Sequence, residues 1–207
     1  MDDRPPPRCL SSIVTFNAMK TLIIGLGNPI LGDDGVGWKV AQEVERHLRS
    51  SPHALPVQGE GHKGEKIDVE CLSLAGISLM ERIIGYQRVI LIDSLNTGQH
   101  AQGEVVTFSL DSLEDLLHGH SASAHDLSLK GALKLGRSMG ADLPEDADIQ
   151  IVAIEAAHVY DFTEELTPEV AVAVPKAVDT VLNFLYRSSS MVSPSGDERS
   201  DSSSKAV

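Results

Sequence analysis

Short apolar runs alternate with amphipathic helical patterns along most of the chain, and this alternation constrains the fold more than any other feature. The apolar runs of strand length are 21–26, 67–74, 88–93, 104–110 and 148–157. Helical patterns begin near Gly35, Gly76, His125 and Pro168. Strands that alternate with helices form a parallel or mixed sheet with helices on both faces. We therefore predict an α/β fold: a three-layer α/β/α sandwich around a twisted, mostly parallel five-stranded sheet.

Two of the helical patterns define a buried face. After Gly35, apolar side chains recur every fourth residue, at Val36, Val40, Val44 and Leu48. This spacing is typical of one face of an amphipathic helix. At the last helix, Thr167 suits the N-cap and Pro168 suits the first helical position. The apolar stripe that follows consists of Val170, Val174, Val178, Val181 and Leu185. Both stripes are predicted to pack against the sheet.

The two ends of the chain differ from the central part, which is predicted to form one domain over residues 20–187. Residues 1–19 have an acidic start, three prolines and no sustained apolar core, so we predict a loose extension rather than a signal peptide. Met19 directly precedes the first strand and is a candidate for the true start. Residues 188–207 are rich in Ser and nearly lack large apolar residues, which predicts a disordered tail.

Composition limits the partners and the compartment. The chain has 17 Lys and Arg against 30 Asp and Glu, a formal net charge of −13, so a basic surface for nucleic acid is not expected. Its apolar runs are shorter than the roughly 18 residues of a membrane-spanning helix, so no membrane is expected either. The two cysteines, Cys9 and Cys71, lie in dissimilar segments, which favours a reducing cytoplasm.

Glycines and two acids follow the first apolar run. Gly25-Leu26-Gly27 suggests a dinucleotide site, but that fingerprint requires G-x-G-x-x-G to open a helix directly, and residues 28–31 intervene. Asp33 and Asp34 would repel a pyrophosphate, which weighs against a nucleotide. One interpretation of the pair is helix capping, which contributes about 1 kcal/mol. The other is a functional site.

Further polar side chains are expected at the same edge of the sheet. Asp93 ends the third apolar run, as a functional acid or as an anchor for the next loop. His125 begins a helix, where the helix dipole keeps an imidazole neutral and able to bind a metal, although a solvated role is the alternative. Other candidates are His118, His120 and His158. Two carboxylates and one imidazole would form an open site for a divalent cation, and the spacing does not identify the metal.

Four segments, in order, resemble the hydrogenase maturation protease family. They are GLGNPILGDDGVG, LIDSLNTG, SAHDLSL and IEAAHVYDFTEELTPEV. The resemblance covers about residues 20–187 and implies a sheet sandwiched between helices. It implies that Asp34, Asp93 and His125 bind a divalent metal and that the two acids are catalytic. The implied metal is nickel, which would belong to the substrate, and zinc or cadmium could substitute for it.

The resemblance also implies an activity and a partner. The family's members are endopeptidases that remove a short C-terminal peptide from the nickel-loaded precursor of a nickel-iron hydrogenase large subunit. Cleavage would be metal-assisted, through a polarised carbonyl and an activated water, or of the aspartic type, with Asp34 or Asp93 as general base. The sequence has no G-x-S-x-G or H-E-x-x-H motif, which argues against serine hydrolase and zincin chemistry. The alternative is a non-catalytic nickel-sensing chaperone that binds the precursor.

One departure from the family pattern lies at the end of the second strand. Relatives often have an acid followed by Gly-Gly-Thr there, whereas this chain has Glu70, Cys71 and then Leu-Ser-Leu-Ala-Gly. The family's acid would fall on Cys71, or on Glu70 after a shift of one residue. This implies a divergent subgroup with its own substrate.

Overall fold

The computed structural model describes residues 19–50, 66–112 and 124–189, and within these ranges the side chains of 124–128 and 187–189 are not described. The predicted extension over residues 1–19 and the predicted tail over 188–207 therefore lie almost entirely outside the described residues. Most of the predicted domain over residues 20–187 lies within them, apart from residues 51–65 and 113–123.

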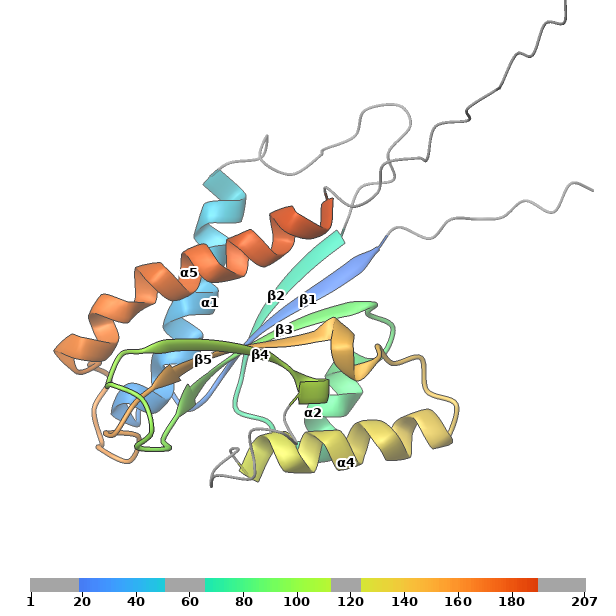
Figure 1. Ribbon diagram of the computed structural model, residues 1–207, viewed down its shortest axis with the longest axis horizontal. Coiled ribbons are helices and arrows are strands. Elements are labelled where there is room, and N and C mark those ends of the chain that lie inside the picture. The colour runs from blue at the N-terminus through green and yellow to red at the C-terminus, as the bar shows by residue number, and fades with distance from the viewer. Residues whose placement is uncertain (1–18, 51–65, 113–123, 190–207) are drawn as a thin grey trace, which may run out of the picture.

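Five strands form one sheet, and their order across it is β2-β1-β3-β5-β4. The strands are β1 (Lys20–Leu26), β2 (Lys66–Leu72), β3 (Arg88–Leu95), β4 (Val105–Ser109) and β5 (Ile149–Glu155). The first three and β5 run parallel, and β4 pairs antiparallel with β5 at one edge (Figure 1). The prediction of a mostly parallel five-stranded sheet is confirmed, with each strand within a few residues of its apolar run.

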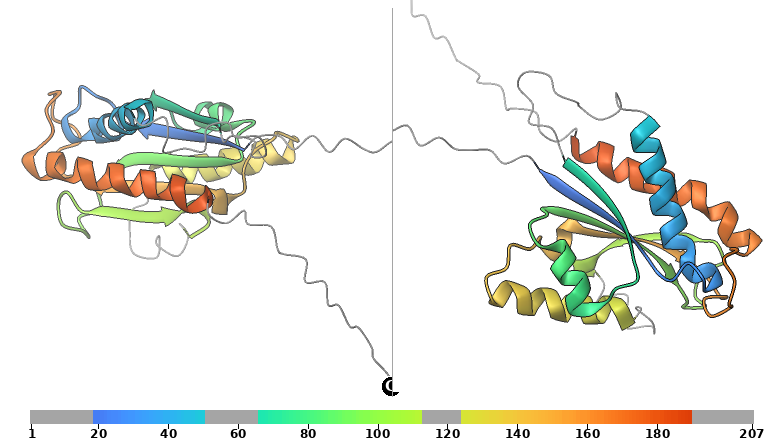
Figure 2. Two further views of the ribbon diagram at one scale, coloured as in Figure 1. Left: turned by 90° about the horizontal axis from the view of Figure 1, so that it is seen from above. Right: turned by 180° about the vertical axis from the view of Figure 1, so that it is seen from behind.

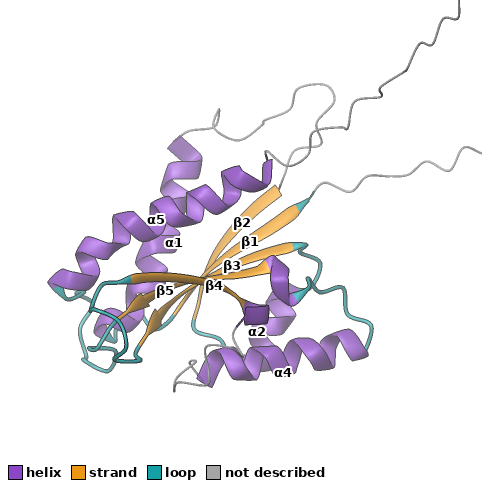
Figure 3. Cartoon of the chain, in the orientation of Figure 1, coloured by secondary structure: helices purple, strands orange, loops and turns teal. Residues whose placement is uncertain are grey.

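Helices cover both faces of the sheet, as predicted. One face carries α1 (Val36–Ser50) and α5 (Pro168–Ser189), and the other carries α2 (Gly76–Ile83) and α4 (Ala124–Ser138), which the two views of Figure 2 show as layers on either side of the strands. Figure 3 shows the same layers with helices and strands in different colours. Within the residues the structure describes, no helix has both the length and the apolar character needed to cross a membrane.

The three inner strands, β1, β3 and β5, are largely apolar because helices bury both of their faces. Ile23 packs in the cluster beneath α1 and α5, while Leu22 and Ile24 pack in the cluster beneath α2 and α4. In the predicted stripe of α5, Val170, Val178, Val181 and Leu185 are buried and Val174 is partly buried. Each fully buried aliphatic side chain contributes about 1.5–3 kcal/mol, so these two clusters account for most of the stabilisation of the sandwich.

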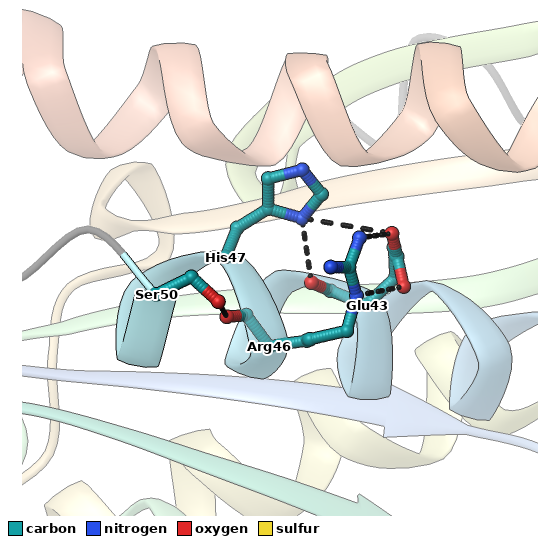
Figure 4. A network of polar contacts seen from close by, with 4 residues as sticks. All are labelled: Glu43, Arg46, His47 and Ser50. Atoms are coloured by element: carbon teal, nitrogen blue, oxygen red, sulfur yellow. Dashed lines mark hydrogen bonds and ion pairs between the residues drawn. The ribbon is translucent and has the colours of Figure 1, made fainter.

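The exposed side of α1 next to α5 carries a polar network that contributes little to stability (Figure 4). Arg46 pairs with Glu43 through Nε at 2.9 Å and through a second nitrogen, and the Nδ1 of His47 lies 2.8 Å from the Glu43 carbonyl oxygen (Figure 4). The hydrogen bond from Arg46 holds the pKa of Glu43 below its usual value. Because these side chains are exposed, solvent screens the pairing. We therefore treat the network as surface structure rather than as part of a site.

The connections reverse direction between β1 and β3. The chain passes from β1 through α1 to β2 on one side, and it returns through α2 to β3 on the other side of β1. In open α/β sheets, such a reversal leaves a crevice at the carboxyl ends of the two strands, and ligands bind there. The strand order therefore favours a functional site at the carboxyl ends of β1 and β3.

Candidate functional site

Three glycines allow the start of α1 to enter the space between the ends of β1 and β3. A Cβ atom on Gly37 would lie 2.3 Å from the Leu26 carbonyl oxygen and 2.4 Å from that of Ile92. A Cβ on Gly25 would lie 2.3 Å from the Gly37 carbonyl oxygen. At Gly27, whose φ is +115°, a Cβ would lie 1.8 Å from the carbonyl oxygen of Asp34. The protein's own chain therefore fills the space over Gly27.

Asp34 is brought to this end of the sheet by the 3₁₀ turn η1 (Gly32–Gly35). Its carboxylate is half-buried, and each oxygen accepts one hydrogen bond. Oδ2 accepts from the Asn28 N–H at 2.7 Å, and Oδ1 accepts from the Ser94 hydroxyl at 3.2 Å. A carboxylate has about four lone-pair positions, so two remain for a cation or a proton.

Asp93 lies at the end of β3 and is also half-buried. Its neighbours Leu91 and Leu95 belong to the cluster beneath α2 and α4, so strand alternation places the Asp93 side chain toward that face. Ser94 faces the other way, and it contacts both acids. Its hydroxyl donates to Asp34, and its N–H donates to Oδ1 of Asp93 at 2.8 Å. Each of the two predicted catalytic acids therefore accepts a hydrogen bond from Ser94, a residue that sequence reasoning did not identify.

The third predicted ligand, His125, is the second residue of α4, and its side chain lies outside the described residues. From the end of α4 the chain runs to the start of β5, so the first turn of α4 points toward the carboxyl edge (Figure 1). The helix packs on the face toward which Asp93 is directed. Among the described side chains, no group of three His, Cys, Asp or Glu is close enough to hold a metal.

The alternative histidines divide into two kinds. His118 and His120 lie outside the described residues. His158 is exposed, and its Nδ1 lies 2.8 Å from Oδ2 of Asp161. Its imidazole is thus engaged within its own loop rather than at the two acids.

Glu70 and Cys71 point to opposite faces of β2. Glu70 forms an ion pair with Arg82 of α2, with Oε2 3.0 Å from Nε. Cys71 packs in the cluster beneath α1 and α5, with Sγ 3.8 Å from the Trp38 carbonyl oxygen. Burial raises the pKa of the Cys71 thiol, which favours the protonated, unreactive form. Glu70 and Cys71 stand where relatives often have an acid. Here Glu70 is engaged in an ion pair, and Cys71 is packed against α1.

Asp33 differs from its neighbour Asp34 in being fully buried. Its Oδ1 accepts the Thr167 N–H at 2.7 Å, and its Oδ2 accepts the Thr167 hydroxyl at 2.9 Å. Thr167 directly precedes Pro168, the first residue of α5. Asp33 therefore acts at a helix start, but at the start of α5 rather than of the helix that follows Gly35.

Glu155 is a second buried carboxylate at this edge, and sequence reasoning assigned it no role. Its Oε1 accepts the N–H groups of Thr97 at 2.8 Å and of Gly98 at 2.7 Å, and its Oε2 accepts the Thr97 hydroxyl at 2.8 Å. These bonds fasten the loop that follows Asp93 and Ser94. The available signal was an acid at the end of a buried strand, the same signal that identified Asp93.

Glu155→Ala is expected to lower the free energy of unfolding by about 2 kcal/mol, because three donors of the Thr97–Gly98 turn lose their acceptor. Glu155→Gln should cost less than about 1 kcal/mol, since the amide oxygen still accepts the two N–H groups. Urea denaturation measures both losses. In Glu155→Ala, amide hydrogen exchange should be faster than in wild type at Thr97 and Gly98, and it should be unchanged at Gly140, which lies just beyond the end of α4. Equal stability of wild type and Glu155→Ala would contradict this role.

The comparisons with known proteins agree on one family. The family model described as hydrogenase maturation protease matches residues 72–184, more than half of the chain. Protein FrxA of Pyrococcus furiosus is 27% identical over 155 residues, which are 75% of this chain and 97% of that protein. The hydrogenase expression/formation protein HupD of Thiocapsa roseopersicina is 21% identical over 164 residues, which cover 79% of this chain and 66% of HupD, just under two thirds.

Solved structures agree with these sequence matches. The hydrogenase maturating endopeptidase HybD of Escherichia coli superposes with a TM-score of 0.60 at 22% identity, over 82% of this chain and 94% of that one, and so supports the fold. The [NiFe] hydrogenase maturation protease HybD of Thermococcus kodakarensis has a TM-score of 0.56 at 27% identity, over 80% and 99%. With its sandwich fold and the match over residues 72–184, this chain belongs to the hydrogenase maturation protease family.

Proposed function

We propose that this protein is an endopeptidase that removes a short C-terminal peptide from the nickel-loaded precursor of a nickel-iron hydrogenase large subunit. One observation carries the proposal within the family: Ser94 donates a hydrogen bond to both Asp34 and Asp93 at the carboxyl ends of β1 and β3. The processing would take place in the cytoplasm, the compartment that the cysteine usage favours.

The two acids suit a site that recognises nickel in the substrate. Asp34 and Asp93 are half-buried, so they are held in place yet remain accessible, and Asp34 retains lone pairs after its two hydrogen bonds. His125 would supply a nitrogen ligand from the first turn of α4. The set of two carboxylates and one imidazole leaves positions open for groups that already hold the metal in the precursor.

Hydrolysis itself requires a base close to the scissile bond. One of the two carboxylates would take a proton from water, the resulting hydroxide would add to the carbonyl carbon, and the C–N bond would then break. The same carboxyl group would return its proton to the leaving amine, which yields a new C-terminal carboxylate and a free peptide. Ser94 would keep the acids apart and oriented, since it donates to each of them.

Mass spectrometry of the precursor after incubation with the protein tests this function. We expect the nickel-loaded precursor to lose a short C-terminal peptide, and the nickel-free precursor to keep it. An unchanged mass in a stable complex would instead support the nickel-sensing chaperone.

The purified protein is expected to take up one nickel, cadmium or zinc ion per chain, because the proposed ligand set is open rather than a closed four-ligand cage. Asp93→Ala and His125→Ala should each weaken this uptake at least about tenfold, within the range for the loss of a ligand or its support. Calorimetry with each metal salt measures the affinity. His47→Ala, which removes an exposed imidazole on α1, is the matched control and should bind as wild type does. Unchanged uptake in both site variants would refute the assignment of these ligands.

A further inference from the structure

Two aromatic rings project from the loop between β5 and α5. Tyr160 is 83% exposed and Phe162 is 84% exposed, more than any other large hydrophobic residue in the described part of the chain. Isolated exposed hydrophobic residues are common on protein surfaces. Here two large rings lie two residues apart, so a single partner could bury both of them, which favours association. We call residues 157–165 the aromatic loop.

The aromatic loop is held firmly at both ends. The His158 carbonyl oxygen accepts the Asp33 N–H at 3.0 Å, and the Thr163 carbonyl oxygen accepts the Gly32 N–H at 2.7 Å. Asp161 bonds to His158 within the loop, and Thr163 Oγ1 accepts the Glu165 N–H at 3.1 Å. The rings are therefore displayed on an ordered support. A preordered loop loses little entropy when it binds, which favours a docking role.

The anchors of the aromatic loop place it beside the proposed catalytic acids. Gly32 and Asp33, which bond to its backbone, immediately precede Asp34 in η1. Asp33 also holds Thr167, where α5 begins, so the loop lies toward the α1 and α5 side of the edge. Asp93 is directed toward the opposite face. A partner seated on the aromatic loop would thus lie beside Asp34 without occupying the space next to Asp93.

The edge around the aromatic loop is strongly acidic. The described loops at the carboxyl ends of the strands, residues 27–35, 73–75, 96–104 and 156–167, contain no Lys or Arg. Their carboxylates are Asp33, Asp34, Glu104, Asp161, Glu164 and Glu165. Asp161, Glu164 and Glu165 are exposed on the loop itself, and the whole chain carries a net charge of −13. Charge complementarity therefore favours a basic protein surface, and it disfavours nucleic acid and anionic membranes.

We propose that the aromatic loop docks the folded body of the precursor, at an apolar depression bordered by Lys and Arg that lies apart from the peptide to be cut. This inference rests on the proposed function, because it takes the precursor as the partner. The interface follows the usual anatomy of protein recognition, in which buried aromatic anchors are surrounded by a polar, complementary rim. Docking would supply affinity and selectivity, and the acids would supply chemistry.

Steady-state processing of the nickel-loaded precursor tests the docking surface. We compare wild type with the double variant Tyr160→Ser/Phe162→Ser and with Met139→Ser, which removes a 79% exposed side chain beyond the end of α4. The double variant should have a KM at least about tenfold higher than wild type, because it loses the aromatic anchors of the interface. Its kcat should stay within about twofold of wild type. Met139→Ser should leave both constants unchanged. The wild-type KM should also rise with salt as screening weakens the charged rim.

A KM for the double variant within about twofold of wild type would overturn the docking proposal while leaving the protease intact. If wild type does not cut the precursor at all, the proposed function fails, and pull-down of the precursor then decides docking separately. If the double variant alone fails to capture the precursor, while wild type and Met139→Ser retain it, the result supports docking through the aromatic loop. Equal capture by all three proteins would refute docking there. Sedimentation of the chain alone completes the test: a wild-type dimer that the double variant dissociates would show that a second copy covers the rings, against the proposal.

Discussion

Asp34→Asn is expected to reduce processing of the nickel-loaded precursor by about 10²- to 10⁴-fold, the range for loss of a general base, while the protein unfolds within about 1 kcal/mol of wild type. The structure explains why stability should survive. The amide oxygen of asparagine can accept the Asn28 N–H, and its NH₂ group can donate to the Ser94 hydroxyl, so both hydrogen bonds of Asp34 have a replacement.

Activity should not survive the same change, because it depends on the charge. A neutral amide is a much poorer ligand for a divalent cation than a carboxylate, and it cannot take a proton from water. Asp179→Asn is the matched control, since it removes one exposed carboxylate of α5 that faces α1, far from the two acids in the sequence, and should process at the wild-type rate. The measurements are initial rates by mass spectrometry and urea denaturation. Processing by Asp34→Asn within a few-fold of wild type would show that Asp34 is only structural.

Asp33→Ala is expected to have the opposite effect, with a loss of about 3 kcal/mol of stability. Asp33 is fully buried, and its carboxylate accepts both the N–H and the hydroxyl of Thr167. Removing it leaves these donors without their acceptor where the η1 turn meets the start of α5. Truncating one partner of such a buried polar pair costs more than the pair contributes, because the remaining partner stays desolvated.

The comparison with Asp33→Asn separates hydrogen bonding from charge. Asparagine still presents an oxygen to the Thr167 N–H, so we expect a loss of only about 1 kcal/mol. At a temperature where both variants are folded, Asp33→Asn should process the precursor far better than Asp34→Asn. Denaturant midpoints for Asp33→Ala and Asp34→Ala that coincide would contradict the division of roles between the two acids.

Hydrophobic patterning was sufficient to predict the architecture. The stripe from Val170 to Leu185 is buried as predicted, and the apolar run that ends at Asp93 forms β3. These patterns are informative because burial acts on each element locally: a strand covered on both faces must be apolar along its length, and a helix on a sheet must be apolar along one side. The position of Asp34 and Asp93 at one edge also follows from parallel strands, whose carboxyl ends coincide.

The roles of individual polar residues were decided by tertiary contacts. Asp33 and Asp34 are adjacent acids in the same turn, and only the fold shows that the first reaches Thr167, which is 134 residues away, whereas the second reaches Ser94. Glu155 likewise bonds to a loop 58 residues earlier. A hydrogen bond depends on direction and on a few tenths of an ångström, and the partners here are fixed by strand order rather than by neighbours in sequence. The sequence by itself determined the sandwich and the edge at which its acids gather, and the tertiary structure decided which acid is buried against Thr167 and which stays partly exposed.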